Sequence, residues 1–337
     1  MNEPTWIDQN SPSQLKELLQ KYDVLGGRDV TSVSIAGEGN MNVTLRVTLA
    51  AGDSKESIIV KQSRPFVAKY DSIPAPLERI GFEAKFYDFV ESQSDLKSKM
   101  PRRLAWIPEE KVLVLEDLGA ASDATSLYAK YPCDELPSCI GPLVDWLALL
   151  HQRSRDEHKP EKGLNSELRK LNHEHIFSIP FNEPSAIDLD DVCSGLAKES
   201  LPIRTDEELR SKAKELGGLY LGDGPCLLHG DFYPGSWLMT DQGPMVIDPE
   251  FMFWGPAEFD LGVLVAHLHF VGVQEPIQKL EPMWGSRYQN VDLSLVRRFA
   301  AIEILRRLLG VAQLPLSMNL DARIQLINAA GAELTQV

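Results

Sequence analysis

Cysteine is scarce in this chain, and long apolar runs are missing. The 337 residues include four cysteines, and none of them has a CxxC partner: Cys133, Cys139, Cys193 and Cys226. We expect them to be free thiols in a reducing compartment. No stretch approaches about 18 uninterrupted apolar residues, and the polar, acidic start of the sequence lacks the basic and apolar regions of a signal peptide. These absences predict a cytoplasmic protein without a membrane span.

Positive charge is also in deficit. Lysine and arginine number 34 against 49 aspartate and glutamate residues, which gives a formal net charge of −15. Nucleic acids and anionic membranes bind basic surfaces, so the composition argues against both as general partners. An anionic ligand would have to be held by a few local cations. A small molecule is the expected partner, and a homodimer is one expected assembly.

Two well-known sets of phosphate-handling motifs are absent. The sequence has no GxxxxGK[ST] segment, so a P-loop enzyme is excluded. It also has no HRD with a downstream asparagine, no DFG and no APE, which excludes a protein kinase.

The first 115 or so residues are rich in predicted strands. Leucines at helical spacing predict a helix over residues 11–22. Alternating β-branched residues predict strands at 30–36, 43–50 and 57–62, followed by a helix at 77–92 and a hairpin within 106–119.

The rest of the chain is mostly helical. Apolar residues at i, i+3, i+4 and i+7 predict a helix over 143–154, and further helices are expected within 164–218 and 294–314. Two short strands are expected at 226–230 and 244–248. The predicted fold class is α+β with two lobes: an N-lobe of residues 1–117, with an antiparallel sheet and a helix, and a C-lobe of residues 118–337.

Five features follow one another in a fixed order, although each is weak alone. They are a turn with two glycines (Gly37 to Asn40), a lysine at a strand end (Lys61), a helical glutamate (Glu83), HGD (229–231) and DPE (248–250). A simple hairpin, a solvated lysine and an exposed glutamate are the ordinary explanations of the first three. Phosphoryl transfer explains the order. It needs a backbone turn close to the phosphates and a cation that contacts them, and a carboxylate on a helix holds this cation in place.

The carboxylates of HGD and DPE fit the remaining roles in phosphoryl transfer. Asp231 can accept the proton of a substrate hydroxyl that attacks the γ-phosphate of ATP. Asp248 and Glu250 offer the oxygen ligands that suit Mg²⁺ on phosphates. We expect the two short strands to be neighbours, which would bring Asp231 and Asp248 close together. The alternative is that these carboxylates merely cap helices.

Several segments make the chain similar to a family of kinase-like phosphotransferases. These are GEGNMN, IIVKQ, LVLEDL, HGD with GS after it, VIDPEFMFWGPAEFDLG and IEILRRLLG, and they span residues 35–310. The chain resembles the superfamily of aminoglycoside, choline and homoserine kinases, and within it the 5-methylthioribose kinase branch. DPEF followed by an aromatic residue and GP is the distinctive segment.

The resemblance implies ATP and Mg²⁺ as cofactors and assigns roles to individual residues. The nucleotide would contact Gly37, Gly39, Asn40, Asn42, Lys61, Glu83, Glu116, Asp117 and Leu118, the last three through a hinge that binds adenine. Asp231 would be the catalytic base. The metal would be held by Asp248, Glu250 and Ser236, the last in a position where asparagine is common. The substrate would contact Asp231, Tyr233, Trp254, Arg306 and Arg307.

The arginine pair also has a physical interpretation. Adjacent helical residues point about 100° apart, so one arginine can face a substrate while the other supports the fold or pairs with a carboxylate. Because Arg297 and Arg298 precede them, an exposed basic helix face is the ordinary explanation. In a chain of charge −15, however, stabilising a transferring phosphoryl group needs such cations.

The segment between HGD and GS departs from the family pattern. It is Phe232-Tyr233-Pro234 here, and it lies where the accepting hydroxyl is expected. This departure counts against a standard acceptor of the family but not against phosphoryl transfer. The predicted function is ATP-dependent phosphorylation of a hydroxyl on a sugar, with 5-methylthioribose or a related thiosugar first. An aminoglycoside, choline or another small alcohol is the alternative acceptor, and a nucleotide-binding protein without catalysis is the third hypothesis.

Overall fold

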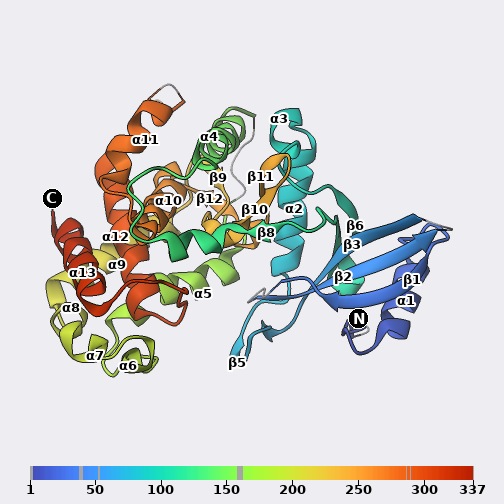
Figure 1. Cartoon of the computed structure of the whole chain (residues 1–337), viewed down its shortest axis with the longest axis horizontal. Coiled ribbons are helices and arrows are strands. Elements are labelled where there is room, and N and C mark those ends of the chain that lie inside the picture. The colour runs from blue at the N-terminus through green and yellow to red at the C-terminus, as the bar shows by residue number, and fades with distance from the viewer. Residues whose placement is uncertain are drawn as a thin grey trace. The chain divides into compact units, whose positions relative to one another are not determined.

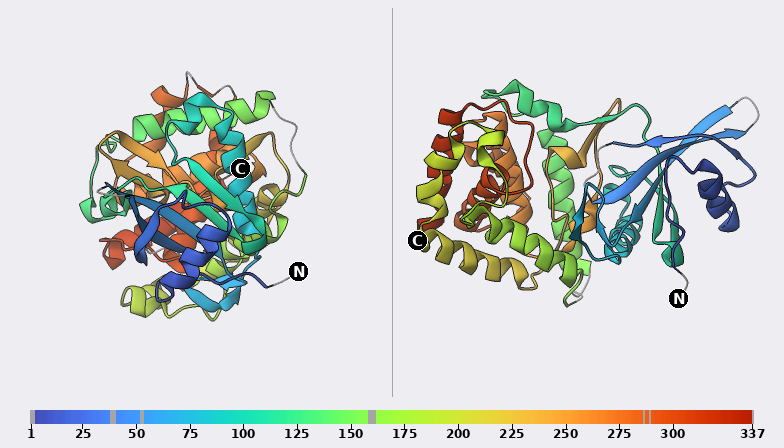
Figure 2. Two further views of the ribbon diagram at one scale, coloured as in Figure 1. Left: turned by 90° about the vertical axis from the view of Figure 1, so that its right-hand side faces the viewer. Right: turned by 90° about the horizontal axis from the view of Figure 1, so that it is seen from below.

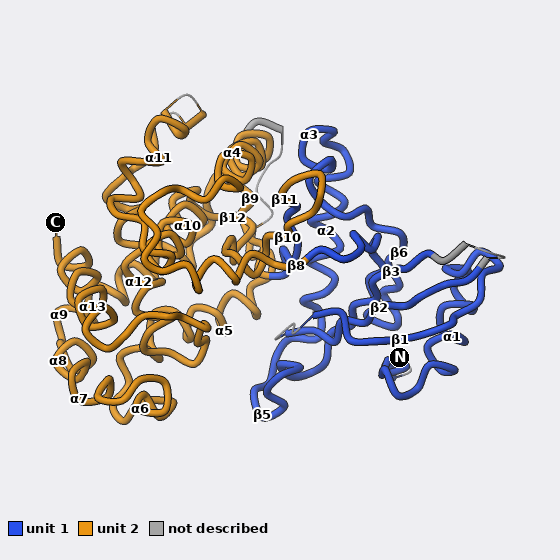
Figure 3. Tube along the Cα trace, viewed as in Figure 1, with its two compact units in different colours: residues 1–121, 245–250 blue, residues 122–244, 251–337 orange. Residues whose placement is uncertain are grey.

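The computed structural model describes residues 3–37, 41–51, 54–157, 162–285, 287–288 and 290–336. The chain divides into two compact units (Figure 3). The first comprises Met1–Ala121 together with Met245–Glu250, and the second Ser122–Pro244 together with Phe251–Val337. The expected division after residue 117 did not foresee that residues 245–250 belong with the N-terminal part. They do so because Val246 N donates to Lys99 O and Asp248 pairs with Lys61.

The first unit is built on an antiparallel sheet of five strands in the order β1-β2-β3-β7-β6 (Figure 1). The strands are β1 (Asp29–Ile35), β2 (Asn42–Ala51), β3 (Ser54–Ser63), β6 (Arg103–Ile107) and β7 (Val112–Glu116). A small hairpin, β4 (Phe66–Val67) and β5 (Tyr70–Pro74), follows β3. The helices are α1 (Pro12–Lys21), α2 (Arg79–Glu91) and α3 (Ser94–Lys97). The predicted strands and both predicted helices of this region are confirmed.

The two faces of this sheet have different chemistry. Alternate residues of a strand point to opposite faces. Leu45, Val47 and Val60 form one apolar core with Leu15 and Leu19 of α1, which lies beside the sheet in Figure 2. The other face takes α2, which buries two charged residues, Arg79 and Glu83, among its apolar ones. A helix with charges on its buried side needs buried partners for them. Lys61 of β3 pairs with Glu83, and the carbonyl oxygens of Met41 and Arg64 accept from Arg79.

The second unit is mostly helical (Figure 1). Its helices are α4 (Ile140–Glu157), α5 (Ser166–Phe177), α6 (Leu189–Val192), α7 (Leu196–Glu199), α8 (Leu201–Arg204), α9 (Glu207–Leu221), α10 (Ala257–Val271), α11 (Pro276–Trp284), α12 (Leu293–Leu309) and α13 (Leu320–Thr335). Almost every residue of α10 is buried. At Gly262 a side chain would meet Phe299 Cβ of α12 at 2.5 Å, so glycine permits this close approach. None of the described helices is both long and apolar enough to cross a membrane.

Short strands complete the second unit. β8 (Ser122–Asp123) pairs with β10 (Trp237–Thr240), and β9 (Cys226–Leu228) pairs with β12 (Phe253–Gly255). The expected pairing of the strands at 226–230 and 244–248 is therefore wrong. The chain runs through β11 (Gly243–Val246), turns at Asp248, where φ is +60°, and places the aromatic segment Phe253–Gly255 beside β9 instead.

Candidate active site

The first polar cluster is built around Lys61 on β3. Thr44 pairs with Lys61 and Asn42 with Ser63, so Asn42 and Lys61 point to the same face of the sheet. Lys61 Nζ donates to both oxygens of Glu83 on α2, at 2.7 and 2.9 Å, and to Asp248 Oδ1 at 2.6 Å. The predicted pair of Lys61 and Glu83 is thus present, with Asp248 on the same ammonium group.

Glu250 also belongs to this cluster, through Asn42 and Arg79. Asn42 Nδ2 donates to Glu250 Oε2 at 2.8 Å, and Arg79 Nε lies 4.0 Å from the same oxygen. Arg79 also donates to the carbonyl oxygens of Met41 and Arg64, so it fixes the backbone just before Asn42. We call Asn42, Lys61, Arg79, Glu83, Asp248 and Glu250 the lysine cluster.

Burial and charge act against each other in the lysine cluster. Burial would lower the pKa of Lys61, but the carboxylates of Asp248 and Glu83 raise it well above its usual value. The lysine is therefore a permanent cation. Burial raises the pKa of Glu250 to about 8, because Lys61 only partly offsets the desolvation of this carboxyl group. An additional cation close to Glu250 would favour its ionised form.

The residues of the lysine cluster fit a magnesium ion. Asn42 Oδ1 is buried and has no hydrogen-bond partner among the described residues, and the carboxyl groups of Asp248 and Glu250 supply further oxygens. No group of three or more histidine, cysteine, aspartate or glutamate side chains within the described ranges forms a metal cage. Mg²⁺ in nucleotide sites is commonly held by one or two carboxylates and by the phosphates, so a complete cage is not needed.

The turn and the hinge lie at the two ends of the strands around Lys61. Gly37 has φ +85°, the left-handed region that glycine adopts without strain. Gly39 and Asn40 lie outside the described residues. At the hinge, Asp117 accepts from Arg46 Nε at 2.7 Å and from Ser57 Oγ at 2.6 Å. Burial would raise the pKa of Asp117, but these hydrogen bonds lower it.

Glu116 forms an ion pair with Arg102, with 3.2 Å between Oε2 and Nε. The carboxylates of Glu116 and Asp117 are therefore both paired. The backbone of residues 116–118 stays the predicted contact for adenine.

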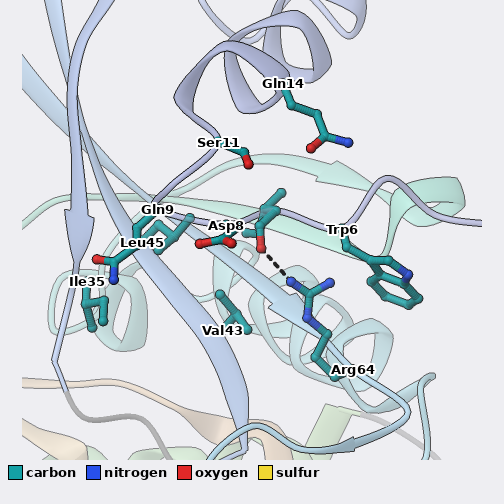
Figure 4. Close-up of a pocket in the computed structure, with 10 residues that line it drawn as sticks. Trp6, Asp8, Gln9, Ser11, Gln14, Ile35, Val43, Leu45 and Arg64 are labelled. Atoms are coloured by element: carbon teal, nitrogen blue, oxygen red, sulfur yellow. Dashed lines mark hydrogen bonds between the residues drawn. The ribbon is translucent and has the colours of Figure 1, made fainter.

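The opposite face of the sheet carries a pocket of about 380 Å³ (Figure 4). Val43 and Leu45 line it, and these residues alternate with Asn42 and Thr44, so they point away from Lys61. Arg64 closes one side, where its guanidinium carbon lies 4.7 Å from the centre of the Trp6 ring and a nitrogen donates to Ile7 O. The pocket contains none of the predicted site residues.

The HGD loop of the second unit is held by a buried carboxylate. Asp260 on α10 accepts from the backbone nitrogens of His229, at 2.8 Å, and Gly230, at 3.0 Å, and from His151 Nε2 at 3.0 Å. Gly230 has φ +86°, and a side chain there would meet Phe251 O at 2.2 Å. These contacts hold the backbone of the loop just before Asp231.

Both predicted arginines reach Asp231. Arg307 Nη2 donates to Asp231 Oδ1 at 3.0 Å, and Arg306 Nη1 lies 3.5 Å from the same oxygen. Both also contact Glu303 on the same helix, with Arg307 Nε 2.6 Å from Oε1 and Arg306 Nη1 3.0 Å from Oε2. Their long side chains converge on this oxygen despite different starting directions, and the contact of either arginine with a substrate stays a prediction. We call Asp231, Glu303, Arg306 and Arg307 the arginine cluster.

The arginine cluster stays charged although it is buried. Burial would raise the pKa of Glu303, but Arg306 and Arg307 lower it well below its usual value. Burial would lower the pKa of Arg307, and Glu303 and Asp231 raise it instead. Oδ1 of Asp231 has partners, whereas none of the residues that the structure describes donates to Oδ2. Asp231 therefore presents one fixed oxygen and one available oxygen.

The remaining predicted residues lie around Asp231 or in the interior. The ring of Tyr233 lies 4.7 Å from the guanidinium carbon of Arg307, a cation–π geometry. Ser236 Oγ donates to Asp231 O at 2.9 Å. Trp254 is buried in β12, opposite Leu227. The roles of Ser236 on the metal and of Trp254 on the substrate stay predictions.

Four contributors were not foreseen from the sequence. They are Asp260, Glu303, Asn172, whose Oδ1 accepts from Arg306 Nη2 at 3.4 Å, and His267, whose Nε2 lies 3.3 Å from Glu303 Oε1. Glu303 had a readable signal, because it stands three and four residues before the arginines, the spacing of neighbours on a helix. The others come from elements whose meeting only the fold decides.

Comparison with known protein families gives the class of this chain, a phosphotransferase. Residues 47–292 match the model of the phosphotransferase enzyme family known as APH. This match covers more than half of the chain, and the chain belongs to that family.

Its relatives of known function include methylthioribose kinases. The chain is 28% identical over 302 residues to the methylthioribose kinase of Exiguobacterium sibiricum, which covers 80% of this chain and 70% of that protein. It is 30% identical over 246 residues to that of Erwinia tasmaniensis, covering 69% and 58%. For methylthioribose kinase 2 of Oryza sativa the identity is 26% over 270 residues, covering 72% and 58%. The chain thus spans less than two thirds of the length of the last two.

Solved structures of related enzymes share the fold. Choline kinase LicA from Streptococcus pneumoniae matches with a TM-score of 0.51 at 16% identity, covering 94% of this chain and 98% of that one. The spectinomycin phosphotransferase APH(9)-Ia, in complex with ADP and spectinomycin, matches with a TM-score of 0.51 at 13% identity, covering 96% and 97%. The predicted α+β class, with an N-terminal antiparallel sheet and a mostly helical remainder, is confirmed.

Proposed function

We propose that the chain is a kinase that transfers the γ-phosphate of ATP to a hydroxyl group of a sugar, with 5-methylthioribose or a related thiosugar as the acceptor. The methylthioribose kinases among its relatives support this choice. The proposal assigns the nucleotide and Mg²⁺ to the lysine cluster and the acceptor to the arginine cluster. Cytoplasmic location and a homodimer stay predictions from the sequence.

One observation carries the proposal: Asp231 has one oxygen held by arginines and the other available. A general base must keep a fixed direction and still have a lone pair for the proton. Oδ1 fixes the direction through Arg307, at 3.0 Å, and Oδ2 supplies the lone pair. A carboxylate that only capped a helix would accept from backbone nitrogens, as Asp206 and Asp292 do through Oδ1, whereas the side chain of Asp231 accepts from Arg307.

The proposed reaction balances with the groups present. The O–H bond of the acceptor breaks and its proton passes to Asp231 Oδ2, while the acceptor oxygen bonds to the γ-phosphorus. The bond between that phosphorus and the β,γ-bridging oxygen breaks, and ADP leaves. Lys61 would contact the phosphates, and Asp248 and Glu250, with Ser236 as a further predicted ligand, would hold Mg²⁺, which supplies charge neutralisation on the phosphates. Residues 37–42 would cover the nucleotide.

The guanidinium groups of the arginine cluster favour a neutral acceptor. Two guanidinium groups lie within 3.5 Å of Asp231 Oδ1, so a polycationic aminoglycoside or a choline would place its charge against them. A polyol offers hydroxyl oxygens, which accept from arginine. The aromatic ring of Tyr233 provides an apolar surface that suits a methylthio group.

A panel of acceptors tests the proposal. ADP formation is measured with ATP and Mg²⁺ and with 5-methylthioribose, other sugars, choline and aminoglycosides, and the product is identified by ³¹P NMR. We expect kcat/KM to be highest for 5-methylthioribose or a thiosugar. Turnover of an aminoglycoside or choline without turnover of a sugar would contradict the proposal in favour of the alternative acceptors. Absence of any turnover would favour a nucleotide-binding protein.

A further inference from the structure

Glu303 holds both arginines from one side of α12. It is fully buried, and it stands three residues before Arg306 and four before Arg307. Each carboxylate oxygen has an arginine partner, at 2.6 Å for Oε1 and 3.0 Å for Oε2. Arg307 Nε, which donates to Glu303, is therefore not available to Asp231.

His267 on α10 supports Glu303 from behind. Its Nε2 lies 3.3 Å from Glu303 Oε1, and both side chains are buried. Burial lowers the pKa of His267 to about 4, so the imidazole is neutral at physiological pH and has one N–H. Glu303 is ionised and can only accept, so the proton of His267 belongs on Nε2.

Tyr128 is the third member of this series of hydrogen-bonded side chains. Its hydroxyl oxygen lies 2.6 Å from His267 Nδ1 and is buried. Because Nε2 carries the proton, Nδ1 accepts, and Tyr128 must donate. Burial raises the pKa of Tyr128 well above its usual value, so its proton is retained. The direction of every bond is thus fixed, from Tyr128 through His267 to Glu303.

This series of hydrogen bonds explains why one oxygen of Asp231 has hydrogen-bond partners and the other does not. A guanidinium group prefers to bind both oxygens of a carboxylate through two parallel N–H bonds. Arg307 uses Nε on Glu303, so only Nη2 reaches Asp231, and it reaches a single oxygen. Arg306 shares Nη1 between Glu303 and the same oxygen. An arginine that Glu303 did not hold could turn its fork onto Asp231 and cover Oδ2.

We propose that Tyr128, His267 and Glu303 form a positioning chain that holds Arg306 and Arg307 on Oδ1 of Asp231 and keeps Oδ2 open for the acceptor hydroxyl. The role of Asp231 in this inference rests on the proposed function. None of the three residues is expected to touch the nucleotide, so their loss affects the acceptor step and leaves the binding of ATP intact.

Glu303→Gln tests the positioning chain, because it keeps the shape and removes the charge. We expect kcat with the best acceptor to fall roughly 100-fold, with KM for ATP within about 2-fold of wild type, and Glu303→Asp to retain more activity than Glu303→Gln. The matched control is Glu215→Gln, which removes an exposed carboxylate 3.5 Å from Arg298 on the same helix. A folded Glu303→Gln protein with wild-type kcat would overturn the proposal.

Tyr128→Phe provides a second route if Glu303→Gln does not fold. It removes one hydroxyl, and we expect kcat to fall about 3- to 10-fold. The effects of Tyr128→Phe and Glu303→Asp on kcat should not be additive in the double variant, because both act through His267. Unchanged kcat in a correctly folded Tyr128→Phe protein would contradict the chain.

Histidine NMR separates this inference from the proposed function. In the full-length wild-type protein labelled with ¹⁵N-histidine, we expect His267 to be neutral with its proton on Nε2 at pH 7. A proton on Nδ1, or a charged ring, would refute the positioning chain even in an active enzyme. If wild type phosphorylates no acceptor while the Nε2–H form is found, the proposed function fails and the hydrogen-bonded chain stands.

Discussion

The lysine cluster has more carboxyl groups than cations, whereas the arginine cluster has equal numbers of both and a spare N–H group. The lysine cluster sets two cations, Lys61 and Arg79, against three carboxyl groups, and it leaves Asn42 Oδ1 without a partner among the described residues. The arginine cluster sets two guanidinium groups against two carboxylates, and Arg306 Nε is buried without a hydrogen bond there. Spare oxygens suit a metal cation, and spare N–H groups suit an oxygen-rich ligand.

This difference teaches how a chain of charge −15 can handle anionic phosphate. It does not use a general positive field. The cations are few, buried and held in place by carboxylates, so their charge acts in a medium that screens it less than water does. Each cluster is expected to serve one substrate, and the predictions below test that separation.

Asp231→Asn has the largest expected effect. The amide oxygen still accepts from Arg307, but the side chain no longer takes up a proton. We expect kcat to fall roughly 1,000-fold while KM for ATP stays near the wild-type value. ADP formation with the best acceptor measures this. A variant with a tenth of wild-type kcat would show that Asp231 is not the base.

Arg306→Ala is expected to affect the kinetics of the acceptor and not the binding of ATP. Removal of the side chain that contacts Asp231 and Asn172 should raise KM for the acceptor or lower kcat, by about 10- to 100-fold in kcat/KM. KM for ATP should stay within about 3-fold. The measurement is steady-state kinetics with each substrate varied in turn, and Arg298→Ala on the same helix is the control. Equal changes for both substrates would mean that the two clusters are not separate.

Lower pH should weaken the arginine cluster. His267 has a pKa of about 4 in the folded protein, against about 6.5 in an unfolded chain, so below pH 6.5 the unfolded state binds more protons. Stability is therefore complete above pH 6.5 and decreases as the pH falls toward 4. We expect a loss of about 2 kcal/mol in the free energy of unfolding between pH 6.5 and 5 from this residue. Urea unfolding of wild type and His267→Gln measures it, and an identical pH dependence in both proteins would be inconsistent with the neutral ring.

Ser236→Ala has the smallest expected effect. Ser236 Oγ donates to Asp231 O, and loss of this bond should lower the free energy of unfolding by about 1 kcal/mol. Thr240→Ala, which removes a similar hydrogen bond to Gly243 O, is the control. A higher Mg²⁺ concentration for half-maximal activity in Ser236→Ala would support its predicted place on the metal. Unchanged stability would show that the hydroxyl does not hold the loop.

The sequence predicts the helices and strands far better than the pairing of strands that are distant in the chain. Alternation in β2 and β3 predicts correct strands, and the lysine at the end of IIV indeed meets Glu83. Strand pairing was not predictable in the same way. The pairing of β9 with β12 follows a turn at Asp248. This turn requires φ +60° at a residue other than glycine, and no local sequence pattern predicts it.

The buried polar partners show the same limit. Glu303 could be found from its spacing to Arg306 and Arg307 on one helix. His267 and Tyr128 could not, because Tyr128 precedes α4, His267 lies in α10, and they meet only after the helices pack. Helical periodicity also placed the arginines about 100° apart, yet their flexible side chains converge on one carboxylate oxygen.

Binding of Mg·ADP, measured by isothermal titration calorimetry, tests the separation of the clusters most directly. We expect wild type and Arg306→Ala to bind Mg·ADP with the same affinity, and Lys61→Met to bind it at least about 10-fold more weakly, because Lys61 is the predicted phosphate contact of the lysine cluster. Circular dichroism confirms that each variant is folded. Equal loss of Mg·ADP affinity in Arg306→Ala and Lys61→Met would contradict the assignment of the nucleotide to the lysine cluster and of the acceptor to the arginine cluster.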